Sequence, residues 1–373
     1  MYTHEISKGL LRAGHEVTVF SSRFQGAPAE ETVDGVRHLR AGNEFTVHFK
    51  GFLYARRNRD SFGLIIDEFN GLGFFGFLLP RSMLLIHQLY REFWFRGLGP
   101  VGGIIPYLVE PLLLRLYRRM PAITVSESTR QDLLGLGFRD ARIVMNALSN
   151  APLDSVPEKE GEPTLIFLGR FAPTKNPLGA LEIFRAVRAE RPEARLWMVG
   201  SGPQEKEVRQ EARGDEGVTF FGWVDEGRKF DLLSRAHLLI VPGVREGFGI
   251  NVIEAASQGT PAVGYDVHGL RDSIRDGETG LLASGPGDAA LKVLRILGDP
   301  ELYARMSSRC LEYARGFNWR SRAEEFRRAF TEHVEKLAEL VSEKIQRTVT
   351  GQKVNEVVIR CNRAQRSFEV FSA

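Results

Sequence analysis

A regular alternation of apolar strands and helical segments between residues 164 and 282 is the feature that most constrains the fold. Each short apolar run there is followed by a longer segment that suits a helix. Strands that alternate with helices form a parallel sheet with helices on both faces. The predicted strands lie at residues 164–168, 195–199, 218–221, 237–241, 261–265 and 280–282. The sequence thus predicts an α/β domain with a Rossmann-like parallel sheet.

A second α/β unit is predicted in front of this domain. The 373 residues of the chain exceed what one ordinary hydrophobic core organises, so two domains are expected. Residues 149–163 are rich in proline, serine and glutamate, which is the composition of a linker. The first unit has predicted strands at residues 15–20, 35–39, 64–68, 83–87 and 122–125. We predict domains at 1–155 and 156–316, a closing helix at 317–346 and a tail at 347–373.

Both ends of the chain depart from the expected plan. Residues 2–13 predict a helix, so the strand and glycine-rich turn that normally open a Rossmann-like half do not precede it. A misassigned start and a shortened protein are both open explanations, and a missing central strand would expose sheet edges. Residues 348–373 alternate in a way that suggests a hairpin. An added edge hairpin, an oligomer contact and a weakly ordered tail remain open for that segment.

Charge and cysteine content exclude several classes of protein. The net charge is only +3 because 47 acids balance the Lys and Arg residues, which does not indicate a nucleic-acid partner. Cys310 and Cys361 match no metal-ligand spacing and are expected as free thiols in a reducing compartment. No secretory signal is apparent, and no apolar run reaches the roughly 18 residues of a membrane span. A cytoplasmic protein is therefore predicted.

The segment 245–255 carries the strongest indication of a ligand site. It follows an apolar strand and combines two glutamates, eight residues apart, with a Gly-Phe-Gly turn and the start of a helix. The glycines allow a ligand to approach the backbone, and the N–H groups of a first helical turn can bind a phosphate. A carboxylate two turns into the helix can accept hydrogen bonds from ribose hydroxyls. The predicted donor-binding residues of this segment are Glu246, Gly247, Phe248, Gly249, Ile250, Asn251, Val252 and Glu254.

Two cationic side chains follow the strand at 164–168. Arg170 and Lys175 flank a Pro-Thr turn after Gly169, where they could neutralise a diphosphate that gains charge as it leaves. A pair of solvated loop charges is the alternative. In the first domain, Glu68, Asn70 and His87 follow predicted strands, and the carboxyl ends of parallel strands face the ligand cleft. For His87, a core position with satisfied hydrogen bonds is equally compatible with the sequence.

Taken in order, these segments resemble retaining glycosyltransferases of family 4, which have the GT-B fold. The E-x7-E pattern of Glu246 and Glu254 is weak alone, but four further segments agree in the correct order: 124–128, 167–176, 196–203 and 218–224. The resemblance implies two Rossmann-like domains that face each other across a cleft, with a final helix that crosses back to the first domain. It also implies transfer of a hexose from a nucleotide-diphosphate sugar, such as a UDP- or GDP-sugar, with retention of configuration.

The same resemblance implies roles for individual residues. Glu246 and the backbone of residues 247–249 would contact the transferred sugar, His87 would lie beside it, and Val224 would meet the base. Gly200 would line the nucleotide pocket. Arg170 and Lys175 would replace a divalent cation, so no metal site and no cofactor are expected. No protein nucleophile is expected either, because in this family the leaving phosphate itself is thought to accept the proton of the acceptor.

The acceptor and the cellular position are less constrained. Basic residues interleave with aromatic ones at 49–59 and 91–96, and Arg115, Arg118 and Arg119 belong to the same basic set. Such a set is typical of a surface that holds anionic lipid or of ordinary charged helices over a core. A sugar or lipid-linked acceptor in glycan or glycolipid biosynthesis is therefore expected, with peripheral contact at the inner face of the membrane. Two alternatives stay open: a nucleotide-sugar epimerase of similar fold and a non-catalytic scaffold subunit.

Overall fold

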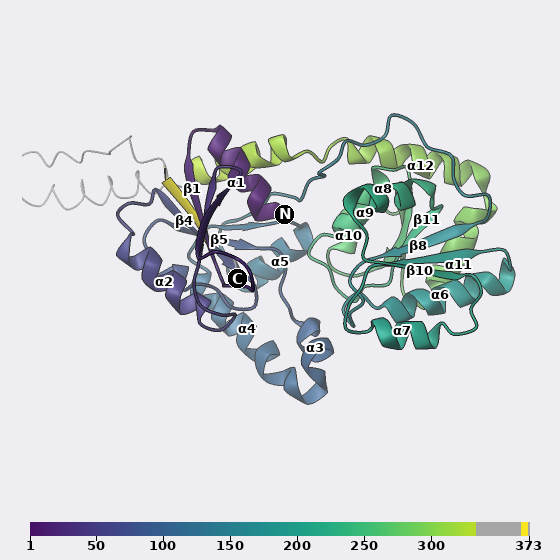
Figure 1. Cartoon of the computed structure of the whole chain (residues 1–373), viewed down its shortest axis with the longest axis horizontal. Helices are drawn as coiled ribbons and strands as arrows, with labels where there is room; N and C mark the ends of the chain where they lie inside the picture. Colours follow the sequence, from purple (N-terminus) through teal and green to yellow (C-terminus); the bar gives the residue numbers. More distant parts are fainter. Residues whose placement is uncertain (333–366, 372–373) are drawn as a thin grey trace, which may run out of the picture.

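The computed structural model describes residues 1–332 and 367–371 of the chain. They form two α/β domains, each built on one sheet with helices packed on its faces (Figure 1). The predicted fold class of two Rossmann-like α/β domains is therefore confirmed. None of the helices in the described part of the chain combines the length and the hydropathy that a membrane span requires.

The second domain contains a six-stranded sheet in the order β10-β9-β8-β11-β12-β13. Every pair in it is parallel, because each strand is followed by a helix that returns the chain to the same end of the sheet. All six strands that the sequence predicts are present within one residue of their predicted limits. They are β8 (Thr164–Leu168), β9 (Arg195–Val199), β10 (Val218–Gly222), β11 (Leu238–Val241), β12 (Ala262–Tyr265) and β13 (Gly280–Ala283).

Helices cover both faces of this sheet and bury its apolar side chains in two clusters. Leu196, Ile240 and Val263 are at most 1% exposed, as expected for strands covered on both faces. Cys310, one of the two predicted free thiols, is free and buried, whereas Cys361 lies outside the described residues. The helices are α6 (Pro177–Glu190), α7 (Glu205–Glu211), α8 (Glu226–Arg235), α9 (Ile250–Ala256), α10 (Leu270–Ser273), α11 (Pro286–Gly298) and α12 (Pro300–Ala314).

The first domain contains an eight-stranded sheet in the order β2-β3-β1-β14-β4-β5-β6-β7. Only the β2–β3 pair is antiparallel. The five predicted strands correspond to β1 and β3 to β6, and the sequence reasoning missed β2 and β7. The strands are β1 (Glu16–Ser21), β2 (Glu30–Val33), β3 (Val36–Arg40), β4 (Leu64–Phe69), β5 (Ser82–Ile86), β6 (Ala122–Thr124), β7 (Ala141–Ile143) and β14 (Ser367–Phe371).

Strand β14 occupies the centre of this sheet, although it comes from the far end of the chain (Figure 1, yellow). It runs parallel to β1 and β4, and Val370 pairs with Val19 on one side and with Ile66 on the other. The expectation that a missing central strand exposes sheet edges is therefore wrong. The proposed edge-hairpin role for this segment is also wrong, because β14 is not at an edge. The other half of the predicted hairpin lies outside the described residues.

Helix α1 (Tyr2–Arg12) covers one face of the first sheet together with the helical residues 319–332. The two helices approach closely because Gly9 has no side chain: a Cβ there would lie 2.1 Å from the Cβ of Ala323. Tyr2 and Trp319 join the core between them, with ring centroids 5.7 Å apart. Residues that follow the second domain thus pack on the first. The remainder of the predicted closing helix, 333–346, lies outside the described residues.

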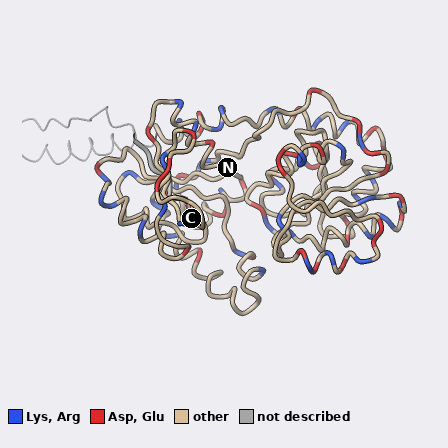
Figure 2. Tube along the Cα trace, viewed as in Figure 1, with Lys and Arg blue, Asp and Glu red and all other residues tan. Residues whose placement is uncertain are grey.

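The other helices of the first domain are α2 (Val47–Arg57), α3 (Glu92–Gly102), α4 (Ile104–Tyr117) and α5 (Glu127–Gly135). Ser126 caps α5 as predicted, since its side-chain oxygen accepts a hydrogen bond from the Thr129 N–H at 3.2 Å. Helices α3 and α4 form a pair that extends away from both sheets (Figure 1). Residues 97–109, which include the turn between the two helices, contain no Lys, Arg, Asp or Glu (Figure 2).

Candidate donor-binding site

The candidate site lies where the strands β8, β9, β10 and β11 end and their loops meet. The loops after β8 and β9 touch each other, because Gly200 adopts a positive φ of 128° and a Cβ there would lie 2.0 Å from the Gly169 carbonyl oxygen. Only glycine fits that position without a shift of the backbone. The predicted residues Gly169 and Gly200 are therefore adjacent in space, although they are 31 positions apart in the sequence.

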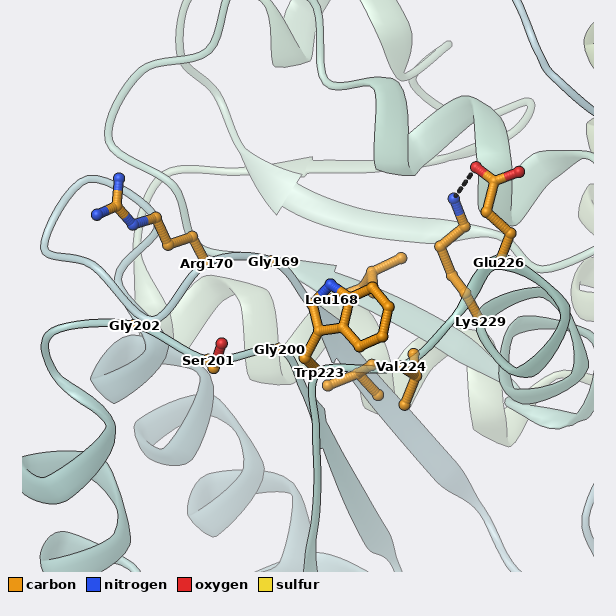
Figure 3. Close-up of a pocket in the computed structure, with 11 residues that line it drawn as sticks. Leu168, Gly169, Arg170, Gly200, Ser201, Gly202, Trp223, Val224, Glu226 and Lys229 are labelled. Carbon is orange, nitrogen blue, oxygen red and sulfur yellow. Dashed lines mark hydrogen bonds and ion pairs between the residues drawn. The ribbon is translucent and has the colours of Figure 1, made fainter. Parts of the chain in front are cut away.

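A cavity of about 560 Å³ opens beside these two glycines (Figure 3). Trp223 and Val224 line one wall, Arg170 extends from the loop on another side, and Lys229 lies opposite (Figure 3). A second hollow of about 350 Å³ shares Leu168, Gly169 and Lys229 with the first. The two hollows are therefore adjacent, and each volume is within the range of small-molecule sites. The second hollow is further lined by Asn146, Lys175, Glu246, Phe248, Gly249, Ile250, Asn251 and Glu254.

Glu246 and Lys175 form an ion pair at the second hollow. The Lys175 ammonium donates to both carboxylate oxygens of Glu246 at 2.7 Å. Glu246 is only 7% exposed, whereas about a third of the Lys175 side chain reaches solvent. The pair brings together two predicted site residues that are 71 positions apart. Lys175 can therefore exchange its carboxylate partner for the phosphate of a ligand.

Glu254 forms a second ion pair that the sequence did not predict. Its Oε1 accepts a hydrogen bond from the Lys229 ammonium at 2.8 Å, and Lys229 comes from α8. Burial raises the pKa of the Glu254 carboxyl, and the positive charge of Lys229 opposes that rise. The sequence does not indicate a role for Lys229, because a lysine in a polar helical segment is usually a solvated surface residue. Lys229 lines both hollows, whereas Arg170 lines only the first and Lys175 only the second.

The start of α9 differs in one respect from the prediction. The Val252 N–H already donates to the Gly249 carbonyl at 3.0 Å, and the Val252 side chain is buried in the core. The Val252 N–H is thus already bonded within the chain, and a contact between this N–H and a ligand stays a prediction. Gly249 has a positive φ of 74°, which turns the chain into the helix. Asn251 donates from its side chain to the Leu168 carbonyl at 3.0 Å and so fixes α9 against β8.

Arg170 is the least constrained of the predicted cations. Within the described residues it makes no ion pair, and its side chain is exposed at the rim of the first hollow (Figure 3). Its guanidinium is therefore available to a ligand without the loss of an existing partner. In this structure Arg170 is a solvated charge on a loop, as the alternative interpretation expected. Lys175 is not, because it pairs with Glu246.

His87 lies at the contact between the two domains. Its Nε2 is 3.3 Å from Glu68 Oε1, and the Tyr2 ring meets its ring edge-on with centroids 5.0 Å apart. The His87 carbonyl oxygen would be 2.9 Å from a Cβ on Gly247, so the loop that carries Glu246 passes directly over it. Glu68 is 8% exposed, and Asn70 is exposed and hydrogen-bonded to Tyr90 instead. The structure thus brings Glu68 and His87 together but leaves Asn70 apart from them.

Two further contacts between the domains were not predicted. Arg245 is 5% exposed and pairs with Glu92 of α3 at 3.1 Å and with Asp132 of α5. Asp272 accepts hydrogen bonds from the Glu127 and Ser128 N–H groups at 2.8 and 3.1 Å, so it caps α5 from the other domain. These contacts hold the Glu246 loop against the first domain.

The comparisons with known proteins agree with this architecture. Residues 153–312 match the model of the glycosyl transferases group 1, and residues 1–146 match that of glycosyltransferase family 4. The chain is 30% identical over 391 aligned residues to D-inositol 3-phosphate glycosyltransferase 2 of Catenulispora acidiphila, with 91% of each chain covered. The chain belongs to glycosyltransferase family 4. This glycosyltransferase therefore has the family and the fold that its sequence motifs predict.

Two other relatives extend the comparison. A shorter match, 36% identical over 178 residues, covers 44% of this glycosyltransferase and 39% of the D-inositol 3-phosphate glycosyltransferase of Nocardia farcinica. Among solved structures, a sucrose-phosphate synthase from Thermosynechococcus elongatus superposes with a TM-score of 0.74. That alignment covers 90% of this glycosyltransferase and 93% of the synthase, at 21% identity, and it supports the GT-B fold alone.

Gly247→Ala is expected to slow the glycosyltransferase by about tenfold or more in kcat/KM, because the new Cβ would lie 2.9 Å from the His87 carbonyl oxygen and displace the Glu246 loop. Steady-state kinetics with the physiological donor would measure the effect. Gly287→Ala is the matched control, since a Cβ there meets no atom within 4 Å. Equal kinetics for the two variants would contradict a tight contact between the domains at this point.

Proposed function

We propose that this glycosyltransferase moves a hexose from a nucleotide-diphosphate sugar to an acceptor hydroxyl with retention of configuration. One observation carries the proposal: two ion pairs, Lys175–Glu246 and Lys229–Glu254, stand beside two adjacent hollows at the ends of the strands. Such a site offers carboxylates for sugar hydroxyls and ammonium groups for phosphates at short distances from each other. A glycan or glycolipid is the proposed product.

Each part of the donor has a proposed set of partners. The base would lie in the hollow beside Trp223 and Val224, and Glu254 would accept hydrogen bonds from the ribose. Arg170 and Lys175 would bind the diphosphate, and Glu246 would contact the hexose. The volumes of about 560 and 350 Å³ suit a nucleoside and a sugar respectively.

The proposed chemistry needs only the charges that this chain supplies. The acceptor oxygen would form a bond to the anomeric carbon while the bond from that carbon to the diphosphate oxygen breaks. The electron pair of the broken bond would remain on the diphosphate, and the acceptor proton would pass to a phosphate oxygen on the same face. Lys175 and Arg170 would stabilise the growing negative charge, which lowers the barrier more than it strengthens donor binding. We propose no metal or other cofactor for this step.

Nucleotide binding is the first test of the proposed function. Thermal unfolding would be measured with UDP, GDP and ADP in excess. A nucleotide at about 100 times its dissociation constant stabilises the native state by roughly 2.7 kcal/mol, so one of the three should raise the melting temperature clearly. Glu254→Ala should abolish this shift, because the proposed ribose contact is lost and Lys229 keeps no buried partner.

Glu246→Gln is the companion variant and separates binding from transfer. It should abolish transfer while the nucleotide still binds, and binding should tighten slightly because Lys175 no longer has a carboxylate to satisfy. Transfer would be measured as nucleotide released in the presence of acceptor. A parent protein that melts cooperatively without any nucleotide effect would favour the scaffold alternative. Donor sugar that changes configuration without an acceptor would favour the epimerase.

A further inference from the structure

Helices α3 and α4 pack on each other and only their common base contacts the rest of the first domain. The rings of Phe95 and Tyr107 lie 5.1 Å apart between the two helices. The base is fixed by Glu110, which is 2% exposed and accepts hydrogen bonds from the Tyr90 and Arg91 N–H groups at 2.7 and 2.9 Å. The pair is therefore anchored at its base and projects from the first domain (Figure 1).

The outer face of this projection is apolar. Eight of the 17 large apolar side chains that are exposed in the described residues lie on it. Positions 105, 108, 112 and 116 of α4 follow helical spacing, so they form one continuous stripe. An exposed apolar surface of this extent is unusual for a soluble protein and indicates an interaction site. The eight residues are Leu98 (57%), Val101 (81%), Ile104 (47%), Ile105 (73%), Leu108 (59%), Val109 (39%), Leu112 (57%) and Leu116 (52%).

The charges around the stripe are almost all positive. The region 91–119 contains five arginines and only two acids, Glu92 and Glu110. Glu110 is buried against backbone N–H groups, and Glu92 pairs with Arg245 of the second domain. Arg91 is partly buried, with its guanidinium over the Tyr107 ring. Neither acid of this region forms an ion pair with the four exposed arginines, Arg96, Arg115, Arg118 and Arg119, within the described residues.

We propose that α3 and α4 lie in the interfacial plane of an anionic lipid bilayer, with the apolar stripe among the acyl chains and the arginines at the headgroups. Helix α4 has 14 residues and a length of roughly 21 Å, which is too short to cross the roughly 30 Å hydrocarbon core. A second copy of the chain is a poorer partner, because a twofold contact would oppose the same four exposed arginines across the interface.

This position would bring the cleft to the membrane. Glu92 begins α3 and pairs at 3.1 Å with Arg245, the residue before Glu246. The base of the projection thus adjoins the loop that carries the proposed sugar contact, and a lipid-linked acceptor in the bilayer would reach it over a short distance. This consequence rests on the proposed function, whereas bilayer binding by α3 and α4 is independent of it.

Vesicle flotation without any donor tests the inference. The full chain would be mixed with phosphatidylcholine vesicles that contain or lack about 30% phosphatidylglycerol. The phosphatidylglycerol gives the vesicles a negative surface potential. The parent should float with the anionic vesicles. The variant Ile105→Ser/Leu108→Ser/Leu112→Ser should bind at least tenfold more weakly, and its melting temperature should not fall because these side chains are exposed. Leu291→Ser, exposed to 68% in the second domain, should bind like the parent.

A variant with fewer positive charges tests whether the arginines contact the anionic headgroups. Arg115→Gln/Arg118→Gln/Arg119→Gln should weaken binding to anionic vesicles by about a hundredfold at low salt, while binding to neutral vesicles should change little. The same loss of three charges in the second domain, Arg213→Gln/Arg295→Gln/Arg305→Gln, is the control and should have a much smaller effect. All three control arginines are exposed and lie outside the α3–α4 projection.

Three results would overturn the inference. The parent protein could remain in the unbound fraction with both kinds of vesicle. The triple serine variant could float as well as the parent, which would assign the lipid contact to another surface. Sedimentation could also reveal a dimer that the serine variant dissociates, in the absence of vesicle binding, which would assign the stripe to contact between copies. Nucleotide-induced thermal shifts in the same samples keep these outcomes distinct from failure of the proposed function.

Discussion

Replacement of Val370 by proline should destabilise the first domain by at least ~2 kcal/mol and lower its melting temperature by roughly 5–10 °C. Val370 stands in the middle of β14, between Val19 and Ile66 of the two neighbouring strands. Proline has no backbone N–H, so the ladder loses a hydrogen bond at the centre of a sheet, where proline is not tolerated. Circular dichroism during heating would give the melting temperature, and hydrogen exchange would locate the change. Peptides that contain β1 and β4 should lose protection, while those of the second domain should keep it.

Ser367→Pro is the matched control in the same strand. Ser367 is the first residue of β14, a position at which proline is accepted because the ladder begins there. The control should melt within a few degrees of the parent protein. If Val370→Pro melts like the control and β1 and β4 keep their protection, the C-terminal strand does not hold the central position of the sheet.

Lys175→Ala should lower kcat by about a hundredfold to a thousandfold, which is the usual effect of removing one group that stabilises charge in the transition state. The ammonium of Lys175 stands at the second hollow, and the diphosphate would take it over from Glu246. The KM for the donor should change much less than kcat, because the charge that Lys175 would stabilise grows as the bond breaks. Initial rates over a range of donor concentrations would separate the two parameters.

Lys206→Ala provides a control of the same chemistry. Lys206 is exposed on α7 and lines neither hollow, so its removal should leave both parameters unchanged. A second check is Lys175→Arg, which keeps the charge but has a larger headgroup and should recover part of the rate. A Lys175→Ala variant that turns over at the parental rate would remove Lys175 from the proposed diphosphate site.

Local sequence patterns were sufficient for most of the second domain. Its six strands are apolar runs separated by helices, and all but the edge strand β10 are largely buried. That pattern has only one common solution, a parallel sheet covered on both faces. The residues at the ends of those strands then meet at one edge by geometry alone. For this reason Lys175, Glu246 and Glu254 could be assigned to one site from their positions in the sequence, before any contact between them was visible.

Contacts between distant segments required the tertiary structure. Lys229 and Glu254 are 25 residues apart on different helices, and only the packing of α8 against α9 decides that they form an ion pair. The Arg245–Glu92 contact depends in the same way on how the two domains meet. The exposed stripe on α4 was also hidden in the sequence, because an apolar helix that projects from a domain and one that is buried in it have the same composition.

Strand β14 shows most clearly that sequence patterns predict a strand but not the strands with which it pairs. The alternation of residues 367–371 predicts a strand, because side chains on successive residues point to opposite faces. The alternation does not predict which strands pair with it, because the backbone of a short strand can form hydrogen bonds with any free sheet edge. The sequence by itself determined two parallel-sheet domains, the family and most of the predicted residues that line the two hollows. Only the tertiary structure decided that the last strand lies between β1 and β4, where both of its edges are paired.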